Sequence, residues 1–145
     1  MADRKLYLKI GPFTGGTRAA NPEILALFRG SLRRSMQAAL PHTGILEGAE
    51  EKYLGKGGKP AFIVDGNVLK LEERDTGSFL ATKCEVKVLI ARWPSRSVIL
   101  WTSAGAEVQG GKRERDRENA RRDCLEASAG QLADSLVEYF KAQGG

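Results

Sequence analysis

The first stretch that could carry chemistry is a glycine-rich segment near the N-terminus, Gly11–Thr17, which reads GPFTGGT. A strand, a glycine loop and a helix in that order form a phosphate-binding loop. The spacing is one residue short of the Walker pattern, because Thr17 follows Gly16 directly and no lysine precedes it. That lysine reaches the β- and γ-phosphates, so we expect no nucleotide site. We predict that Gly15 and Gly16 supply positive φ for a turn into the first helix.

No other set of residues has the spacing of a catalytic or metal-binding centre. The single histidine, His42, follows Pro41 in an expected turn, and no cysteine or carboxylate cluster lies beside it. Asp65, in the stretch VDGN, could be a catalytic carboxylate, but Asp-Gly is more typical of a bend in a strand. No nucleophile stands beside a suitable base. We therefore predict a protein without enzyme activity, cofactor or metal.

The two cysteines, Cys84 and Cys124, are the remaining reactive side chains. They fall on a strand and a helix that are expected to pack together, so they could pair. Closing that 40-residue separation would stabilise the fold by about 4 kcal/mol in the chain-entropy model. Two buried free thiols, common in cytosolic proteins, are the alternative. Neither cysteine belongs to a CxxC or Cys/His pattern, and the residues alone leave both states open.

The run from residue 112 to 123 resembles a nucleic-acid-binding tail in composition. Six of its residues are basic and four are acidic: Lys112, Arg113, Arg115, Arg117, Arg121 and Arg122 against Glu114, Asp116, Glu118 and Asp123. Acids three or four residues ahead of arginines form ion pairs on a helix, each worth about 0.2–0.5 kcal/mol. The pairs at this spacing are Glu118 with Arg121 and Arg122, and Glu114 with Arg117. We predict a solvated helix face with internal pairs, because a phosphate-binding surface would not interleave acids.

Periodicity predicts the elements that position these residues. Residues 5–10 alternate as a half-buried strand. Asn21 caps a helix that starts with Pro22 and ends before Pro41, with an apolar stripe at Leu25, Phe28, Leu32, Met36 and Leu40. Arg29, Arg33 and Arg34 lie off this stripe and are expected to face solvent, with Arg29 and Arg33 available to a partner. A short strand at Ile45–Leu46 and a helical turn at 50–54 are expected next.

Three strands at 61–73, 81–93 and 97–109 follow, joined by short turns that predict an antiparallel meander. A long helix closes the chain, with an apolar stripe at Leu125, Ala129, Leu132, Leu136 and Phe140. We predict an α+β fold: a two-layer α/β sandwich with a mostly antiparallel sheet and two long helices on one face, in the order β-α-(β)-β-β-β-α. One domain is expected over residues 1–145, with an ordered core at 5–141.

One face of the predicted sheet should be apolar yet uncovered. If Cys84, Val86, Val88 and Ile90 face the helices, Leu89 faces outward, together with Tyr7 on the first strand and either Trp101 or Ile99 on the third. Lys5, Lys9 and Lys87 flank this surface. An aromatic face of this kind suits a protein partner or self-association. It could also stack bases, although the aromatic signature of an RNA-recognition strand does not occur. Tyr7, Leu89 and Trp101 are therefore predicted partner-binding residues.

Composition excludes several classes of protein. The chain has 145 residues, 41% hydrophobic and 28% charged, as in globular domains. No apolar run approaches the roughly 20 residues that cross a bilayer. The first ten residues, MADRKLYLKI, do not form a signal peptide. The net charge of +5 is modest for a nucleic-acid-binding protein.

The middle of the sequence resembles a known family. The strand FIVDGNVLKLEE is followed by the hairpin CEVKVLIARWPSRSVILWTSAGAEV and a long helix, with LYLKIGPFTG at the start. Together these stretches resemble small periplasmic lipoprotein domains of the peptidoglycan-synthase-activator and curli-secretion (CsgG-like) group. The resemblance covers most of residues 5–140. It implies a non-enzymatic α/β sandwich, held at the outer membrane by an N-terminal lipidated cysteine and acting through protein contacts.

Several further expectations depend on this resemblance. The lipidated cysteine would lie outside this sequence. An exported protein would favour a disulfide between Cys84 and Cys124. We therefore expect a non-catalytic interaction domain of a periplasmic, outer-membrane-associated protein that binds another protein or itself. Two alternatives remain: a cytoplasmic nucleic-acid-binding module using Arg29, Arg33, Arg34 and residues 112–122, and a small enzyme with a pocket around Asp65.

Overall fold

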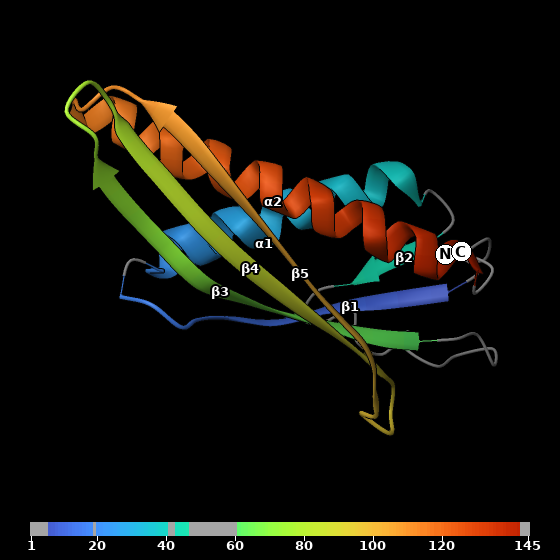
Figure 1. Ribbon diagram of the computed structural model, residues 1–145. Helices are drawn as coiled ribbons and strands as arrows, with labels where there is room; N and C mark the ends of the chain where they lie inside the picture. The colour runs from blue at the N-terminus through green and yellow to red at the C-terminus, as the bar shows by residue number, and fades with distance from the viewer. Residues whose placement is uncertain (1–5, 19, 41–42, 47–60, 143–145) are drawn as a thin grey trace.

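Two helices cover one face of a five-stranded sheet in the computed structural model, which describes residues 6–18, 20–40, 43–46 and 61–142 (Figure 1). The predicted α+β sandwich and the predicted order of elements are confirmed. The elements are β1 (Leu6–Gly15), α1 (Pro22–Ala39), β2 (Thr43–Leu46), β3 (Ala61–Asp75), β4 (Leu80–Arg92), β5 (Val98–Gly110) and α2 (Glu114–Ala142). The helical turn expected at 50–54 and His42 lie outside the described residues.

The strands lie in the order β2-β1-β3-β4-β5. The predicted antiparallel meander is formed by β3, β4 and β5, whose long pairings make the sheet mostly antiparallel. β1 lies parallel to both β2 and β3. Because β1 and β3 run in the same direction, the first residues of both strands lie at the same end of the sheet, where β4 ends and β5 begins.

The core lies between the helices and the inner face of the sheet. α1 begins as the sequence predicts, with Pro22 in its first turn and the Asn21 side chain accepting a hydrogen bond from Ile24 N at 2.9 Å. The predicted apolar stripe buries Phe28, among others, while Phe140 of α2 packs on β3. Neither described helix has an apolar stretch that could cross a membrane.

β1 continues through the segment that the sequence predicted to be a turn. After an irregularity between Ile10 and Phe13, residues 13–15 pair with β3 in a shifted register. The only positive-φ glycine in the described residues is Gly77, so Gly15 and Gly16 do not have the predicted conformation. Close approach requires the glycine at Gly66, where a Cβ would lie 2.6 Å from the Phe13 ring. The predicted turn into the helix is therefore limited to residues 16–18, because pairing with β3 satisfies the backbone of residues 13–15 in extended form.

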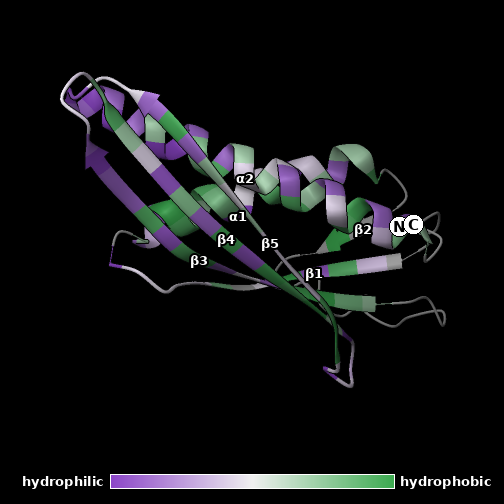
Figure 2. Ribbon diagram, in the orientation of Figure 1, coloured by the Kyte–Doolittle hydropathy of each residue, from purple (hydrophilic) through white to green (hydrophobic). Residues whose placement is uncertain are grey.

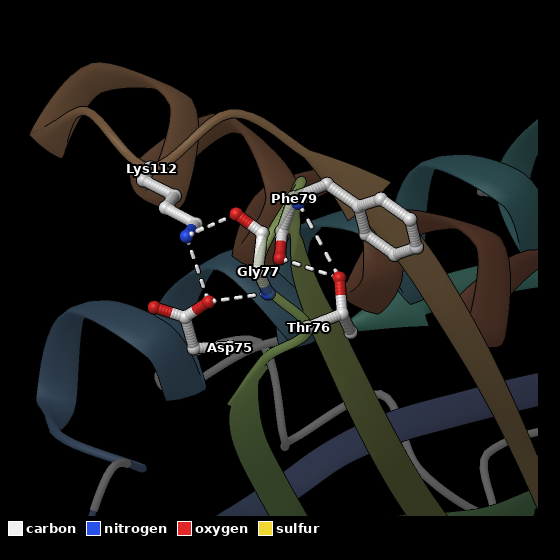
Figure 3. A network of polar contacts seen from close by, with 5 residues as sticks. All are labelled: Asp75, Thr76, Gly77, Phe79 and Lys112. Atoms are coloured by element: carbon white, nitrogen blue, oxygen red, sulfur yellow. Dashed lines mark hydrogen bonds and ion pairs between the residues drawn. The ribbon is translucent and has the colours of Figure 1, made fainter.

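The β3–β4 hairpin is closed by a network of polar contacts (Figure 3). Gly77, at φ +94°, donates its amide to Asp75 Oδ1 at 2.8 Å. Thr76 Oγ1 donates to Phe79 O at 2.8 Å. Lys112, just before α2, reaches back to Asp75 Oδ1 at 2.8 Å and to Gly77 O at 2.7 Å. The lysine hydrogen bond holds the pKa of the Asp75 carboxyl below its usual range, with a smaller effect from the Gly77 amide.

A disulfide between Cys84 and Cys124 joins β4 to α2. Both cysteines are fully buried, and their Cα atoms are 6.2 Å apart. The buried Ser128 hydroxyl, one helical turn after Cys124, lies 3.2 Å from Cys84 Sγ. It is the donor in this contact, because a disulfide sulfur carries no hydrogen. The bond therefore fixes the first half of α2 over the inner face of the sheet.

Loss of this disulfide should lower stability without changing the fold. The chain-entropy model gives about 4 kcal/mol for a bridge of this separation. We expect urea unfolding of the oxidised protein to have a higher midpoint than unfolding in reductant, with similar far-ultraviolet circular dichroism before the transition. The double variant Cys84→Ala/Cys124→Ala should match the reduced protein and should not respond to reductant. Equal midpoints with and without reductant would contradict the bridge.

Candidate functional site

The open face of the sheet, on the side away from both helices, carries the large exposed apolar side chains found among the described residues. Trp101 is 61% exposed, Val98 58% and Leu69 41%. The two halves of this face differ in chemistry: the C-terminal half of β3 is mainly hydrophilic, whereas the start of β3 is hydrophobic (Figure 2). No helix covers this face in the described part of the chain, so its aromatic half is the first candidate for a contact surface.

Three cations lie over the two tryptophans of this aromatic half. Lys87 Nζ is 5.1 Å from the Trp101 ring centroid, and the Arg96 guanidinium is 5.4 Å from that of Trp93. Lys9 of β1 also approaches Trp93, with its Nζ 6.0 Å from the ring centroid. Cation–π contacts at such distances contribute about 0.5–1 kcal/mol each at exposed sites. They order the long basic side chains on the aromatic surface.

The other half of the open face is polar and self-neutralised. Lys70 of β3 lies 3.9 Å from Glu85 of β4, and Arg74 lies 3.7 Å from Glu107 of β5. Ion pairs at such exposed positions contribute little to stability. They leave this half without the excess positive charge of the aromatic half.

A hollow of about 300 Å³ lies where the two halves meet, lined by Asp65, Asn67, Leu69, Lys87 and Leu89 among others. Asp65 Oδ1 is buried, and no described group donates a hydrogen bond to it. Gly11 of β1 covers this oxygen so closely that a Cβ at Gly11 would overlap it. This oxygen therefore lies against β1, while the Asp65 side chain still contributes to the lining of the hollow.

Burial raises the pKa of the Asp65 carboxyl above its usual range, while the nearby charges of Arg96 and Lys9 act in the opposite direction. Desolvation therefore outweighs both cations. No group of three potential metal ligands is present in the described residues. These observations leave Asp65 as a half-buried carboxyl beneath a glycine, at the strand position that the sequence predicted.

The predicted partner-binding residues fall in different environments. Leu89 and Trp101 lie opposite each other in the β4–β5 pairing, as expected for neighbours on the open face. Tyr7 also points to that face but is only 5% exposed, because it packs with Ala61 and Trp93. The sequence could not show that the hairpin end folds over it.

The arginines of α1 are less exposed than the sequence predicted. Arg29 is half-buried, and its Nη2 donates to Ile10 O of β1 at 3.2 Å. Arg33 is also half-buried, while Arg34 is exposed. The expectation that all three face solvent was wrong for Arg29 and Arg33. The Nε atoms of both guanidinium groups are buried.

The basic run at the start of α2 pairs mainly with the sheet. Arg117 and Arg121 contact the carboxylate of Glu73 on β3 at 2.8 Å and 2.6 Å. Glu73 is 18% exposed, so this two-arginine clamp is partly shielded from water. The predicted internal pairs of the helix are replaced by contacts across 44 and 48 residues of chain, which local spacing cannot reveal.

The free edge of β5 is a second candidate surface, which the sequence analysis missed. β5 is 13 residues long and ends the sheet in the described structure. Its one charged residue is Glu107. Gln131 of α2 donates to Gly105 O at 3.2 Å, so the Gly105 carbonyl faces away from β4. The length of β5 and its near absence of charge were visible in the sequence, but its edge position was not.

No family model matches the sequence, and no curated protein matches it. Solved structures share its fold at low sequence identity. A Xanthomonas campestris protein of family DUF330 aligns with a TM-score of 0.64 and 12% identity, over 97% of this chain and 86% of that chain. The PelC dodecamer from Paraburkholderia phytofirmans aligns with a TM-score of 0.54 and 11% identity, over 90% and 89%.

A minor lipoprotein from Acinetobacter baumannii aligns with a TM-score of 0.51 and 9% identity, over 99% of this chain and 96% of that chain. The fold is thus one that DUF330 proteins and bacterial lipoproteins share. The narrower resemblance to the peptidoglycan-synthase-activator and CsgG-like group stays a prediction.

Two aspartates of β3 should respond to pH in opposite ways. The raised pKa of Asp65 means that its ionisation weakens the fold as pH rises from about 3.8 through the folded value. Asp65→Asn should therefore raise the melting temperature at pH 7, and the gain should vanish in acid. The lowered pKa of Asp75 means that its charge stabilises the fold above about pH 3.8 and that this contribution is lost as pH falls through the lower folded value.

Asp75→Asn is the matched control, since it makes the same chemical change on the same strand. We expect it to lower the melting temperature at pH 7 and to have little effect near pH 2. Thermal unfolding followed by circular dichroism at both pH values measures the two differences. Shifts of the same sign for both variants at pH 7 would show that the described environments are wrong.

Proposed function

We propose that this chain is a non-catalytic interaction domain of an envelope-associated protein, which acts by assembling with further copies of itself along the free edge of β5. The single observation that carries the proposal is that edge. The shared fold with the PelC dodecamer and with a bacterial lipoprotein supports it by analogy. The wider interpretation, a periplasmic domain held at the outer membrane by a lipid anchor, rests on the same analogy.

An unpaired edge strand is a template for pairing with another chain, and proteins protect such edges with charges, prolines or short strands. β5 is long, has no proline and has one charge, Glu107, and among its free-side backbone groups the Gly105 carbonyl is covered by Gln131 of α2. Its small residues, including Ser103 and Gly105, leave the backbone accessible to a second strand. A second copy of the chain fits this edge, because backbone pairing needs no other chemistry.

The alternation of an antiparallel ladder identifies the groups that would pair. Because Gly105 O faces the free side, the backbone groups of Ser103, two residues earlier, face it too. Trp101 precedes Ser103 by two residues, and its exposed ring lies on the open face beside the same edge. Together with Leu89, it would be covered by a neighbouring copy. Tyr7, Arg29 and Arg33 do not belong to this contact.

The envelope location is supported by the disulfide between Cys84 and Cys124. Disulfides persist in oxidising compartments and are rare where thiols are kept reduced. This one is buried and joins the two layers of the fold, so it acts as structural support. A cytoplasmic nucleic-acid-binding role is less well supported, because Glu73 engages two arginines of the basic run.

A proline on the free edge should separate the copies. Ser103→Pro removes an amide that faces away from β4, so it should cost the sheet no ladder bond and leave a folded monomer. We expect the wild-type chain to show a mass of two or more chains by light scattering after size exclusion, and the variant to show one. Ser103→Ala, which keeps the amide, should assemble like the wild type.

The proposal fails if the wild type elutes as a monomer at every concentration tested. It also fails if Ser103→Pro is folded, as shown by an unchanged circular dichroism spectrum, and still assembles. Should Ser103→Pro unfold, Ser103→Lys is the replacement, since a charge on the free edge blocks pairing while keeping the amide. Salt-dependent binding of an oligonucleotide by a monomeric wild type would favour the nucleic-acid role instead.

A further inference from the structure

The β4–β5 hairpin is strongly asymmetric in charge. Between Glu85 and Glu107 the sequence contains three basic residues, Lys87, Arg92 and Arg96, and no acidic residue. The same segment holds both tryptophans of the chain. Asp65 of β3 interacts electrostatically with Arg96, and burial disfavours the charged form of its carboxyl. The outer end of the hairpin is therefore a basic and aromatic surface.

The tip of this hairpin is formed by Arg92, Trp93, Arg96 and Val98, which we call the tip cluster. Arg92 and Arg96 are exposed, Val98 is 58% exposed and Trp93 is half-buried. In Figure 1 this end of the hairpin extends beyond the helical layer. The tip cluster is thus a projecting surface, which fits a broad flat partner better than a small molecule.

Arg96 occupies a backbone conformation that favours glycine. Its φ is 62°, and no other non-glycine residue in the described structure has a positive φ. A side chain in this left-handed region is strained, and glycine would remove the strain. The side chain that is kept there places a guanidinium 5.4 Å from the Trp93 ring centroid. Strain retained at an exposed tip points to a use for the side chain.

We propose that the tip cluster docks on a membrane surface that contains anionic phospholipids. Tryptophan is favoured at the boundary between headgroups and hydrocarbon because its ring is apolar and its N–H is polar. The two arginines match the negative charge of the headgroups, and Val98 adds apolar area at the boundary. The positive charge and the exposed apolar side chains of the tip cluster are therefore both suited to an anionic membrane surface.

The path of the chain supports this orientation. Trp93 N donates to Ala61 O at 3.0 Å, and Ala61 pairs with Tyr7. The start of β1 therefore lies beside the tip cluster. A lipid anchor ahead of β1 would hold this same end of the sheet against the bilayer. The tip surface itself is distinct from the β5 edge, so this inference does not depend on self-assembly.

Intrinsic fluorescence reports the docking directly, because both tryptophans lie on this hairpin. We expect a blue shift when the protein is mixed with vesicles of phosphatidylcholine and phosphatidylglycerol, and none with phosphatidylcholine alone. Co-sedimentation with the same vesicles gives the partition coefficient. High salt should abolish both signals, since it screens the arginines from the headgroups.

Arg96→Gly is the sharpest variant, because it relieves backbone strain while removing a charge. Its melting temperature should be equal to or above that of the wild type, and its partition into anionic vesicles should fall about fivefold. Lys83→Ala is the matched control: it removes one positive charge from an exposed position on the same hairpin, outside the tip. Val98→Ser should also weaken binding without lowering the net charge.

Three results would overturn the proposal: no blue shift with anionic vesicles, equal binding to both vesicle types, or equal losses in Arg96→Gly and Lys83→Ala. A shift produced by single-stranded oligonucleotides and not by vesicles would assign the surface to nucleic acid. Self-assembly is measured separately, by light scattering on the same samples. If the Ser103→Pro variant binds the vesicles as a monomer, membrane docking does not require self-assembly.

Discussion

The helices of this protein cover one face of the sheet, and this constraint determines which surfaces remain for function. Both apolar stripes are used in the core, so the helical layer offers mainly charged residues outward. In the described structure the sheet still presents an uncovered face and the edge of β5, where Gln131 of α2 bonds the Gly105 carbonyl. Trp101, 61% exposed on the last strand, lies where these two surfaces meet. Any function that needs apolar contact must use this side of the molecule.

The covered side is held in place by contacts between distant segments. The Cys84–Cys124 disulfide fixes α2 on β4 at its eleventh residue, and the Glu73 clamp fixes its first turns on β3. Lys112 adds a contact from the chain before α2 to the β3–β4 hairpin. These three attachments lie between Lys112, just before α2, and Cys124 in its first half. They make the two layers a rigid support for the free edge and for the hairpin that projects from it.

Much of this fold was predictable from the sequence, because its local signals agree with its packing. The Asn21-Pro22 cap, the helical stripes and the short turns of the meander each specify an element. Two features were not predictable. The extension of β1 to Gly15 depends on pairing with β3, and the pairing of Arg117 with Glu73 depends on how the hairpin meets α2. Both are long-range contacts.

The candidate surfaces show the same division. Alternation along the strands predicts that Leu89 and Trp101 face outward. It does not predict the burial of Tyr7, because that burial requires the end of the hairpin to pack over β1. The edge position of β5 depends on the strand order, which alternation does not contain. The sequence therefore predicts which aromatic residues lie on the open face, whereas the strand order is needed to show which strand has an unpaired edge.

Hydrogen–deuterium exchange along β5, measured as a function of protein concentration, tests the central claim most directly. Self-assembly through the free edge predicts that amides such as those of Ser103 and Gly105 exchange fast in dilute protein and become protected as the concentration rises. Peptides from α1 should show no such change. Exchange in β5 that is independent of concentration, or protection that appears only in α1, would contradict assembly through this edge.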